Sequence, residues 1–210
     1  MDQTSDLMAG YRRFREHRYE AEQARWRELA EGQSPRAIII ACSDSRADPA
    51  TIFDTDPGEI FVVRNVANLV PPYEAGGGRH GVSAALEFGV VQLAVGLVIV
   101  MGHERCGGIQ AALTGQFHDA PAGEGGFVAK WMSQIDGPAA TIAASHGTGE
   151  DAAQVLEEVA IRLSLANLRT FPFIAEREKA GTLQVVGCHF SISEGQLYML
   201  DEAEDVFRPV

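Results

Sequence analysis

The sequence has little cysteine, no long hydrophobic run and a deficit of positive charge, and each shortage excludes a class of protein. Three cysteines in 210 residues are too few for a disulfide framework. The longest apolar stretch, around residues 93–101, is interrupted by Gly96 and falls short of the ~20 residues that a membrane helix needs. With 17 Lys and Arg against 29 Asp and Glu, the net charge of −12 argues against nucleic acid or an anionic membrane as a partner.

What is present indicates one ordinary globular domain in a reducing compartment. Hydrophobic residues make up 46% of the chain, which is enough for one sizeable core at this length. Residues 1–6 (MDQTSD) lack the basic and apolar regions of a signal peptide, so we expect a cytoplasmic location with free or metal-bound thiols. We predict a single domain over residues 1–210, made of an N-terminal helical arm (1–34) and an α/β core (35–210).

The order of hydrophobic patterns predicts an α/β fold. Short apolar runs typical of buried strands alternate with amphipathic stretches typical of helices, which predicts a mostly parallel sheet of four to five strands flanked by helices. The strands are expected at residues 36–41, 60–63, 97–101, 183–186 and 197–200. The helices are expected at residues 5–31, after the Asp48–Pro49 cap, and at 82–93, 106–113, 127–135 and 150–168.

Four side chains with metal-binding chemistry follow two of the predicted strands. Cys42 and Asp44 come just after the first strand, and His103 and Cys106 come just after the third. Ligands of open parallel sheets bind outside the carboxyl ends of the strands, so both pairs are expected at the same edge. Thiolate, imidazole and carboxylate are the ligands that zinc favours. The sequence therefore predicts a site of two cysteines and one histidine, with Asp44 as a candidate fourth ligand.

Each of these residues also has a structural interpretation. A lone cysteine in a strand is usually a core residue, and an isolated His-x-x-Cys pair is weak evidence by itself. A redox pair is a further alternative, although no Cys-x-x-Cys occurs in the chain. The shared position at two strand ends favours the metal site over these alternatives. The third cysteine, Cys188, is expected to be buried and free.

Three ordered segments resemble the β-class carbonic anhydrases, with features of the plant-type subgroup. Residues 41–49 (ACSDSRADP) resemble the first family signature, residues 61–68 (FVVRNVAN) the segment that follows it, and residues 102–108 (GHERCGG) the second signature. The similarity covers about residues 7–115 well and the remainder weakly. The resemblance implies reversible hydration of CO2 to bicarbonate and a proton, by attack of zinc-bound hydroxide on CO2.

The resemblance also implies roles for individual residues. One Zn²⁺ per chain would be bound by Cys42, His103 and Cys106. Asp44 and Arg46 resemble the family's catalytic dyad, in which Asp44 pairs with Arg46 in the open form and binds the zinc itself in the closed form only. Six further residues are implied in substrate binding, three as hydrogen-bond donors and three as an apolar wall to which a partner subunit contributes: Gln33, Gly107 and Gly108, and Phe61, Val66 and Phe88.

Two other functions remain open, and the resemblance implies a partner. A hydrolase of carbonyl sulfide or carbon disulfide uses the same fold and zinc site. A non-catalytic zinc protein is the second alternative, although the Asp44–Arg46 pair argues against it because a structural site needs no open position. The resemblance further implies self-association as a dimer or tetramer, for which the N-terminal helix would serve as an arm laid over a partner.

Overall fold

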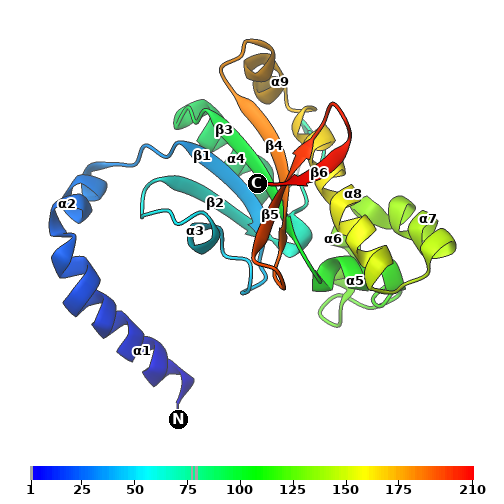
Figure 1. Ribbon diagram of the computed structural model, residues 1–210, viewed down its shortest axis with the longest axis horizontal. Coiled ribbons are helices and arrows are strands. Elements are labelled where there is room, and N and C mark those ends of the chain that lie inside the picture. The colour runs from blue at the N-terminus through cyan, green and yellow to red at the C-terminus, as the bar shows by residue number, and fades with distance from the viewer. Residues whose placement is uncertain (1, 77, 79) are drawn as a thin grey trace. The chain divides into compact units, whose positions relative to one another are not determined.

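The structure is a computed structural model that describes residues 2–76, 78 and 80–210 (Figure 1). The chain divides into two compact units, Met1–Ser34 and Pro35–Val210. This boundary lies where the sequence predicts the junction of arm and core. The assignment of both units to one functional domain stays a prediction, and each unit is described by itself.

The first unit is helical. It contains α1 (Gln3–Arg13), the π-helical segment η1 (Phe14–Tyr19) and α2 (Gln23–Glu31). The ring of Trp26 packs edge-on against Phe14, with centroids 5.5 Å apart, and lies 5.8 Å from the ring of Tyr19. The predicted helix over residues 5–31 therefore contains a π-helical segment and is interrupted at Glu22, and Trp26 makes contacts within its own chain. Leu7 of α1, in contrast, is 73% exposed.

The second unit is built on one six-stranded sheet with the order β2-β1-β3-β4-β5-β6 (Figure 1). The strands β1 to β4 run parallel to one another, whereas β5 pairs antiparallel with both β4 and β6. The mostly parallel sheet is confirmed, but four to five strands is too low a count, because the short last strand carries no hydrophobic alternation. The strands are β1 (Ala37–Cys42), β2 (Ile60–Asn65), β3 (Leu97–His103), β4 (Gln184–Ser191), β5 (Gln196–Asp201) and β6 (Val206–Pro209).

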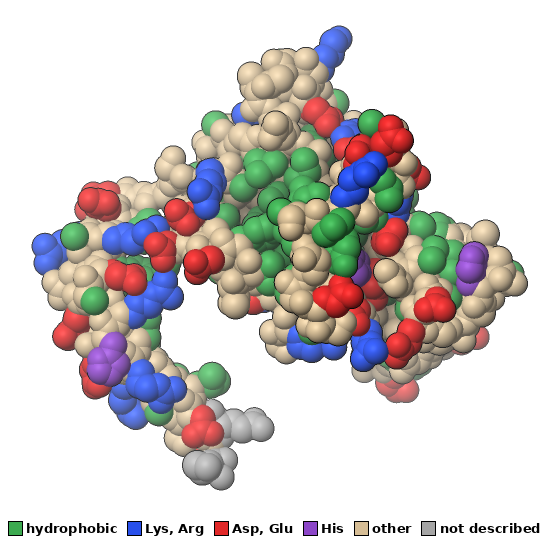
Figure 2. Space-filling view, viewed as in Figure 1, with side chains coloured by type: hydrophobic (Ala, Val, Ile, Leu, Met, Phe, Trp, Pro, Cys, Tyr) green, Lys and Arg blue, Asp and Glu red, His purple; other side chains and the backbone are tan. Residues whose placement is uncertain are grey.

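Helices flank the sheet unequally. Alternate residues of β1 such as Ile38 pack with α4, α8 and α9 on one face, whereas Ile39 packs with the short α3 on the other. In the view of Figure 2, hydrophobic side chains gather over the middle of the sheet. The helical segments are α3 (Pro49–Ile52), η2 (Val66–Asn68), α4 (Gly81–Glu87), η3 (Phe88–Gln92), α5 (Gly107–Thr114), α6 (Gly126–Met132), η4 (Ser133–Ile135), α7 (Asp136–His146), α8 (Glu150–Leu168) and α9 (Pro172–Lys179).

Two of these helices are missing from the sequence-based prediction. The segment that forms α7 is rich in alanine and begins with Gly137 and Pro138, so it shows no periodic apolar stripe. The segment that forms α9 starts at Pro172 and carries a run of charged residues. Among the described residues, no helix combines the length and apolar character required to cross a membrane.

A second core cluster lies beside the carboxyl ends of the strands. It is formed mainly by α5, α6, α7 and the first half of α8, and it includes both Cys42 and Cys106. The junction between this helical cluster and the end of the sheet is therefore where the predicted ligands meet.

Candidate metal centre

Three of the predicted ligands converge at the ends of two adjacent strands. Cys42 is the last residue of β1, and His103 is the last residue of the neighbouring β3. Cys106 follows one short turn later and caps the N-terminus of α5. One ligand atom from each residue lies within 4.8 Å of the other two, and all three residues are buried. The fold thus brings residues that are far apart in the sequence into one compact donor set of two sulfur atoms and one nitrogen atom.

The spacing of the donor atoms fits a tetrahedral metal. The Sγ atoms of Cys42 and Cys106 lie 3.8 Å apart, and both thiols are free. A disulfide would bring them to about 2.05 Å, whereas two thiolates at about 2.3 Å from one tetrahedral Zn²⁺ would lie about 3.8 Å apart. Nδ1 of His103 lies 2.9 Å from the carbonyl oxygen of Glu104. Its buried Nε2 has no hydrogen-bond partner among the described residues, so a lone pair remains for a metal.

The two thiols influence each other's ionisation because their sulfur atoms are 3.8 Å apart. The neighbouring Cys106 thiol lowers the pKa of Cys42, against the opposing effect of burial. The imidazole of His103 and the backbone amides of Asp44 and Ala67 also favour the Cys42 thiolate. The same thiol pairing, together with burial, raises the pKa of Cys106. A cation bound by both sulfur atoms would favour the thiolate form of each.

Cys106 is placed by the helix that follows it. Its sulfur faces the amides of Gly108 and Ile109 in the first turn of α5, which otherwise have no intrahelical partners. The close approach needs a glycine, because a Cβ on Gly108 would lie 2.7 Å from Cγ1 of Val66. The predicted donor Gly108 thus serves the Cys106 sulfur in this structure, and a role in substrate binding stays a prediction for both Gly107 and Gly108.

The predicted dyad forms a bidentate ion pair. Nε of Arg46 donates to Oδ1 of Asp44 at 2.9 Å, and a terminal nitrogen donates to Oδ2 at 2.7 Å. The backbone amide of Arg46 also donates to Oδ1. The guanidinium holds the pKa of Asp44 well below its usual range. Oδ2 of Asp44 stands 3.9 Å from Nε2 of His103, so the paired carboxylate lies at the edge of the donor set. This is the arrangement expected of the open form.

Arg64 braces the same loop, a role that was not predicted from the sequence. Its Nε donates to the carbonyl of Cys42 at 2.9 Å, and it also donates to the carbonyls of Asp44 and Ala47. A further nitrogen lies 3.2 Å from Oδ1 of Asp48. Arg64 lies on β2 next to the end of β1, so a guanidinium one strand away fixes the loop that carries ligand and dyad. An arginine near the end of a strand is the only signal that the sequence offered.

The apolar residues of the predicted substrate wall are not gathered within one chain. Val66 lies against the start of α5 and is close to the donor set. Phe61 and Phe88 contact each other, with ring centroids 5.9 Å apart. Phe61 is paired with Ile38, whereas Asn65 is paired with Cys42, so Phe61 lies roughly 13 Å along β2 from the donor end.

The predicted donor Gln33 belongs to the other compact unit. It follows α2 and is exposed. Its role in substrate binding stays a prediction.

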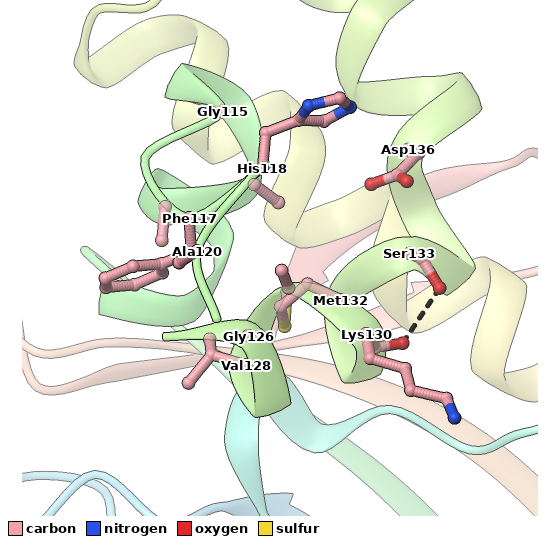
Figure 3. A pocket seen from close by; sticks show the side chains of 13 residues that line it. Gly115, Phe117, His118, Ala120, Gly126, Val128, Lys130, Met132, Ser133 and Asp136 are labelled. Carbon is pink, nitrogen blue, oxygen red and sulfur yellow. Dashed lines mark hydrogen bonds between the residues drawn. The ribbon is translucent and has the colours of Figure 1, made fainter. Parts of the chain in front are cut away.

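A cavity of about 410 Å³ lies beside the second half of α5 (Figure 3). The segment 115–120 and α6 form its walls, and Met132 projects into the middle of the view. Ser133 Oγ donates to the carbonyl of Lys130 at 2.8 Å along one side. Neither the donor set nor the dyad lines this cavity, so it is separate from the metal centre.

Comparison with known proteins agrees with this geometry. Residues 37–197 match the carbonic anhydrase family. The chain belongs to the β-carbonic anhydrase family. It is 34% identical over 200 residues to beta carbonic anhydrase 6, mitochondrial, of Arabidopsis thaliana, a match that covers 93% of this chain and 67% of that protein.

Solved β-carbonic anhydrases share the fold. The structure of CcaA superposes with a TM-score of 0.91 at 31% identity and covers 100% of this chain and 93% of that one. A tetrameric β-carbonic anhydrase of Sordaria macrospora gives a TM-score of 0.80 at 25% identity, with 96% of this chain and 98% of that one covered. These matches confirm the resemblance of the three sequence segments, the fold class and carbonic anhydrase as the class of enzyme.

Proposed function

We propose that this β-carbonic anhydrase hydrates CO2 reversibly with one Zn²⁺ held by Cys42, His103 and Cys106. The observation that supports it is the convergence of two thiols and an unpartnered imidazole nitrogen within 4.8 Å of one another. When bound, zinc lowers the pKa of a water molecule enough to supply a nucleophile near neutral pH.

Asp44 is proposed as the proton acceptor at the edge of this site. A carboxylate offers about four lone-pair positions. Oδ1 accepts two hydrogen bonds from Arg46, whereas Oδ2 accepts one from it and lies toward His103. The remaining position on Oδ2 is therefore available for a water molecule or for the product. Arg46 keeps Asp44 ionised and fixes its orientation through a bidentate contact. The closed form, with Asp44 on the metal, would require Arg46 to release it.

CO2 carries no charge, so its binding is proposed to depend on an apolar wall and few donors. Val66 supplies that wall from the same chain, and we propose that a partner copy supplies Phe61 and Phe88. Phe88 is 46% exposed, as expected for a side chain that becomes covered on association. The amide of Gly107 and the side chain of Gln33 are proposed as donors to substrate oxygen atoms.

The same surface supports self-association as a dimer or tetramer. Val62 and Val91 are exposed together with Phe88, and among the described residues β2 is an edge strand that pairs with β1 alone. Leu7 and Tyr11 are exposed on α1 of the other unit, which suits an arm that packs on a partner. The tetrameric relative from Sordaria macrospora agrees with such an assembly. Sedimentation should show the wild type as a dimer or tetramer and Phe88→Glu as a smaller species; an unchanged assembly would contradict this interface.

The compartment is a separate proposal. Free thiols at a metal site suit a reducing cytoplasm, whereas the Arabidopsis relative is named as mitochondrial. Fractionation of the source cells distinguishes the two locations.

A stopped-flow assay on zinc-quantified protein tests the proposed activity against its two alternatives. The rate of CO2 hydration should rise in proportion to zinc content, and carbonyl sulfide and carbon disulfide should release sulfide far more slowly. Faster sulfide release than CO2 hydration would assign the hydrolase function instead. Full zinc occupancy with neither reaction would assign a non-catalytic role.

A further inference from the structure

A buried carboxylate lies directly behind the donor set, and the proposed reaction does not use it. Glu157 projects from α8 and is 3% exposed. Its Oε1 accepts the backbone N–H of Cys106 at 2.9 Å. Its Oε2 lies 2.9 Å from Nε2 of His189, which is also buried. Since an ionisable group is rarely buried without a specific partner, this pair of contacts needs an explanation.

The hydrogen bond from Cys106 to Glu157 satisfies the backbone N–H of this ligand, whose sulfur already faces amides of α5. Cys106 precedes α5, so its own N–H has no partner within the helix. The residue is 1% exposed, which also removes that N–H from solvent. The amides of Gly108 and Ile109 hold the sulfur from the α5 side. Glu157 holds the backbone from the α8 side, and together these contacts fix both ends of the residue.

His189 in turn orients Glu157. An ionised Glu157 only accepts hydrogen bonds, so in that form Nε2 of His189 is the donor in this contact. His189 lies on β4, paired with Gly102 of β3, and its ring packs edge-on against Phe207. The chain of contacts thus ties the loop after β3 to α8 and to the next strand of the sheet.

We propose that Glu157 and His189 form a positioning pair that keeps the Cys106 thiolate aimed at the metal. The inference rests on the proposed zinc site. Neither residue touches substrate, so the pair acts on metal retention rather than on the chemical step. Partners behind a metal ligand typically change metal affinity by about 10–100-fold when they are removed. A merely structural role would instead lower the stability of the metal-free protein and leave the rate of zinc release unchanged.

The test is the rate at which the holoenzyme releases zinc to a chromophoric chelator, at a temperature well below unfolding of every variant. Glu157→Leu loses both contacts and should release zinc about 10–100-fold faster. Glu157→Gln should stay within about threefold of wild type, because its amide oxygen still accepts from Cys106 and its NH2 can donate to Nε2 of His189 in the other imidazole tautomer. The matched control is Glu158→Gln, since Glu158 is the next residue on α8 and its carboxylate pairs with Arg162 at 3.3 Å.

A second readout and a second variant make the outcome decisive. In the Co²⁺-substituted protein, the sulfur-to-cobalt charge-transfer band should weaken in Glu157→Leu and stay unchanged in Glu157→Gln. If Glu157→Leu does not fold, His189→Leu leaves the carboxylate in place without its support and should still release zinc several-fold faster, with His189→Gln restoring retention.

Two results would overturn the positioning role. The first is a folded Glu157→Leu or His189→Leu variant with the wild-type rate of zinc release and the wild-type charge-transfer band. The second is a Glu158→Gln variant that releases zinc as fast as Glu157→Leu does. Wild-type protein that takes up no zinc would instead overturn the proposed function.

Discussion

The two strand ends that form the metal centre differ in how they are held. The end of β1 carries Cys42 and then the Asp44–Arg46 pair, in which the Arg46 side chain is 48% exposed. The end of β3 carries His103 and Cys106, both buried, with Glu157 and His189 packed behind them. Each end contributes ligands, but the charged pair that stands beside the donor atoms and reaches solvent, Asp44 with Arg46, belongs to the β1 end.

Because of this difference, one site can retain a metal and still exchange protons. Buried polar groups are costly to move once their hydrogen bonds are made, so the β3 end suits retention. Groups at the surface exchange protons and reactants with bulk water, so the β1 end suits turnover. Changes at the β3 end should therefore release metal, and changes in the dyad should slow the reaction while the metal stays bound.

The largest effect is expected from loss of the buried histidine. His103→Ala removes the only nitrogen ligand of the triad and should lower zinc content from about one per chain to near zero, with a loss of rate greater than the ~100-fold typical of residues behind a ligand. Metal analysis and stopped-flow hydration measure both quantities. Full zinc content in this variant would contradict this prediction, because it would show that the β3 end is not required to retain the metal.

The next largest effect is expected in the dyad. Asp44→Asn keeps the size of the side chain but removes the proton acceptor, so the hydration rate should fall about 100–10,000-fold. Zinc content should stay at the wild-type level, since Asp44 is paired with Arg46 rather than aimed at the metal. Loss of zinc in this variant would show that Asp44 is a structural ligand. The two strand ends would then not differ in metal retention.

The pH dependence sharpens the role of Asp44 further. The pKa of Asp44 is held well below its usual range, so the carboxylate is ionised throughout the neutral region. Protons oppose formation of the hydroxide nucleophile, so the rate should rise at least about tenfold from about pH 6.5 to about pH 9. In Asp44→Asn the rate should be lower at every pH with an unchanged midpoint. A midpoint that moves with this substitution would show that the carboxylate itself titrates in the profile.

The smallest effect is expected away from both ends. Cys188 lies on β4 next to Met101 in the sheet and is fully buried. Cys188→Ala should leave zinc content and hydration rate within about twofold of wild type, and should lower the free energy of unfolding by about 1 kcal/mol through lost packing. Chemical denaturation and metal analysis test this. A clear fall in zinc content would extend the site to a third cysteine.

The comparison also explains what the sequence could predict. Cys42, Asp44, His103 and Cys106 stand immediately after apolar runs, and parallel strands bring such positions to one edge of a sheet. The dyad and its pairing came from resemblance, because a short polar loop has no periodicity that would orient Asp44 toward Arg46. The strand β6 was not predicted from the sequence, since it is short and ends at Pro209.

The contacts of Glu157 and His189 behind Cys106 could not be predicted from sequence patterns. Glu157 stands among the apolar positions of α8, with Ala153 and Ile161 one turn away on either side. A charge on a buried stripe is a usable signal, but it does not say which partner the charge meets. The partner is brought from β4 by the topology of the sheet, and only the structure supplies that contact.

The coordination of the bound metal is the most direct test of whether the two strand ends meet on one zinc ion. X-ray absorption at the zinc edge of the wild-type protein should show two sulfur neighbours at about 2.3 Å and lighter nitrogen or oxygen neighbours at about 2.0–2.1 Å. Cys42→Ser and Cys106→Ser, where metal is retained, should each lose one sulfur neighbour. A zinc shell without sulfur, or one that is unchanged by both substitutions, would contradict the account.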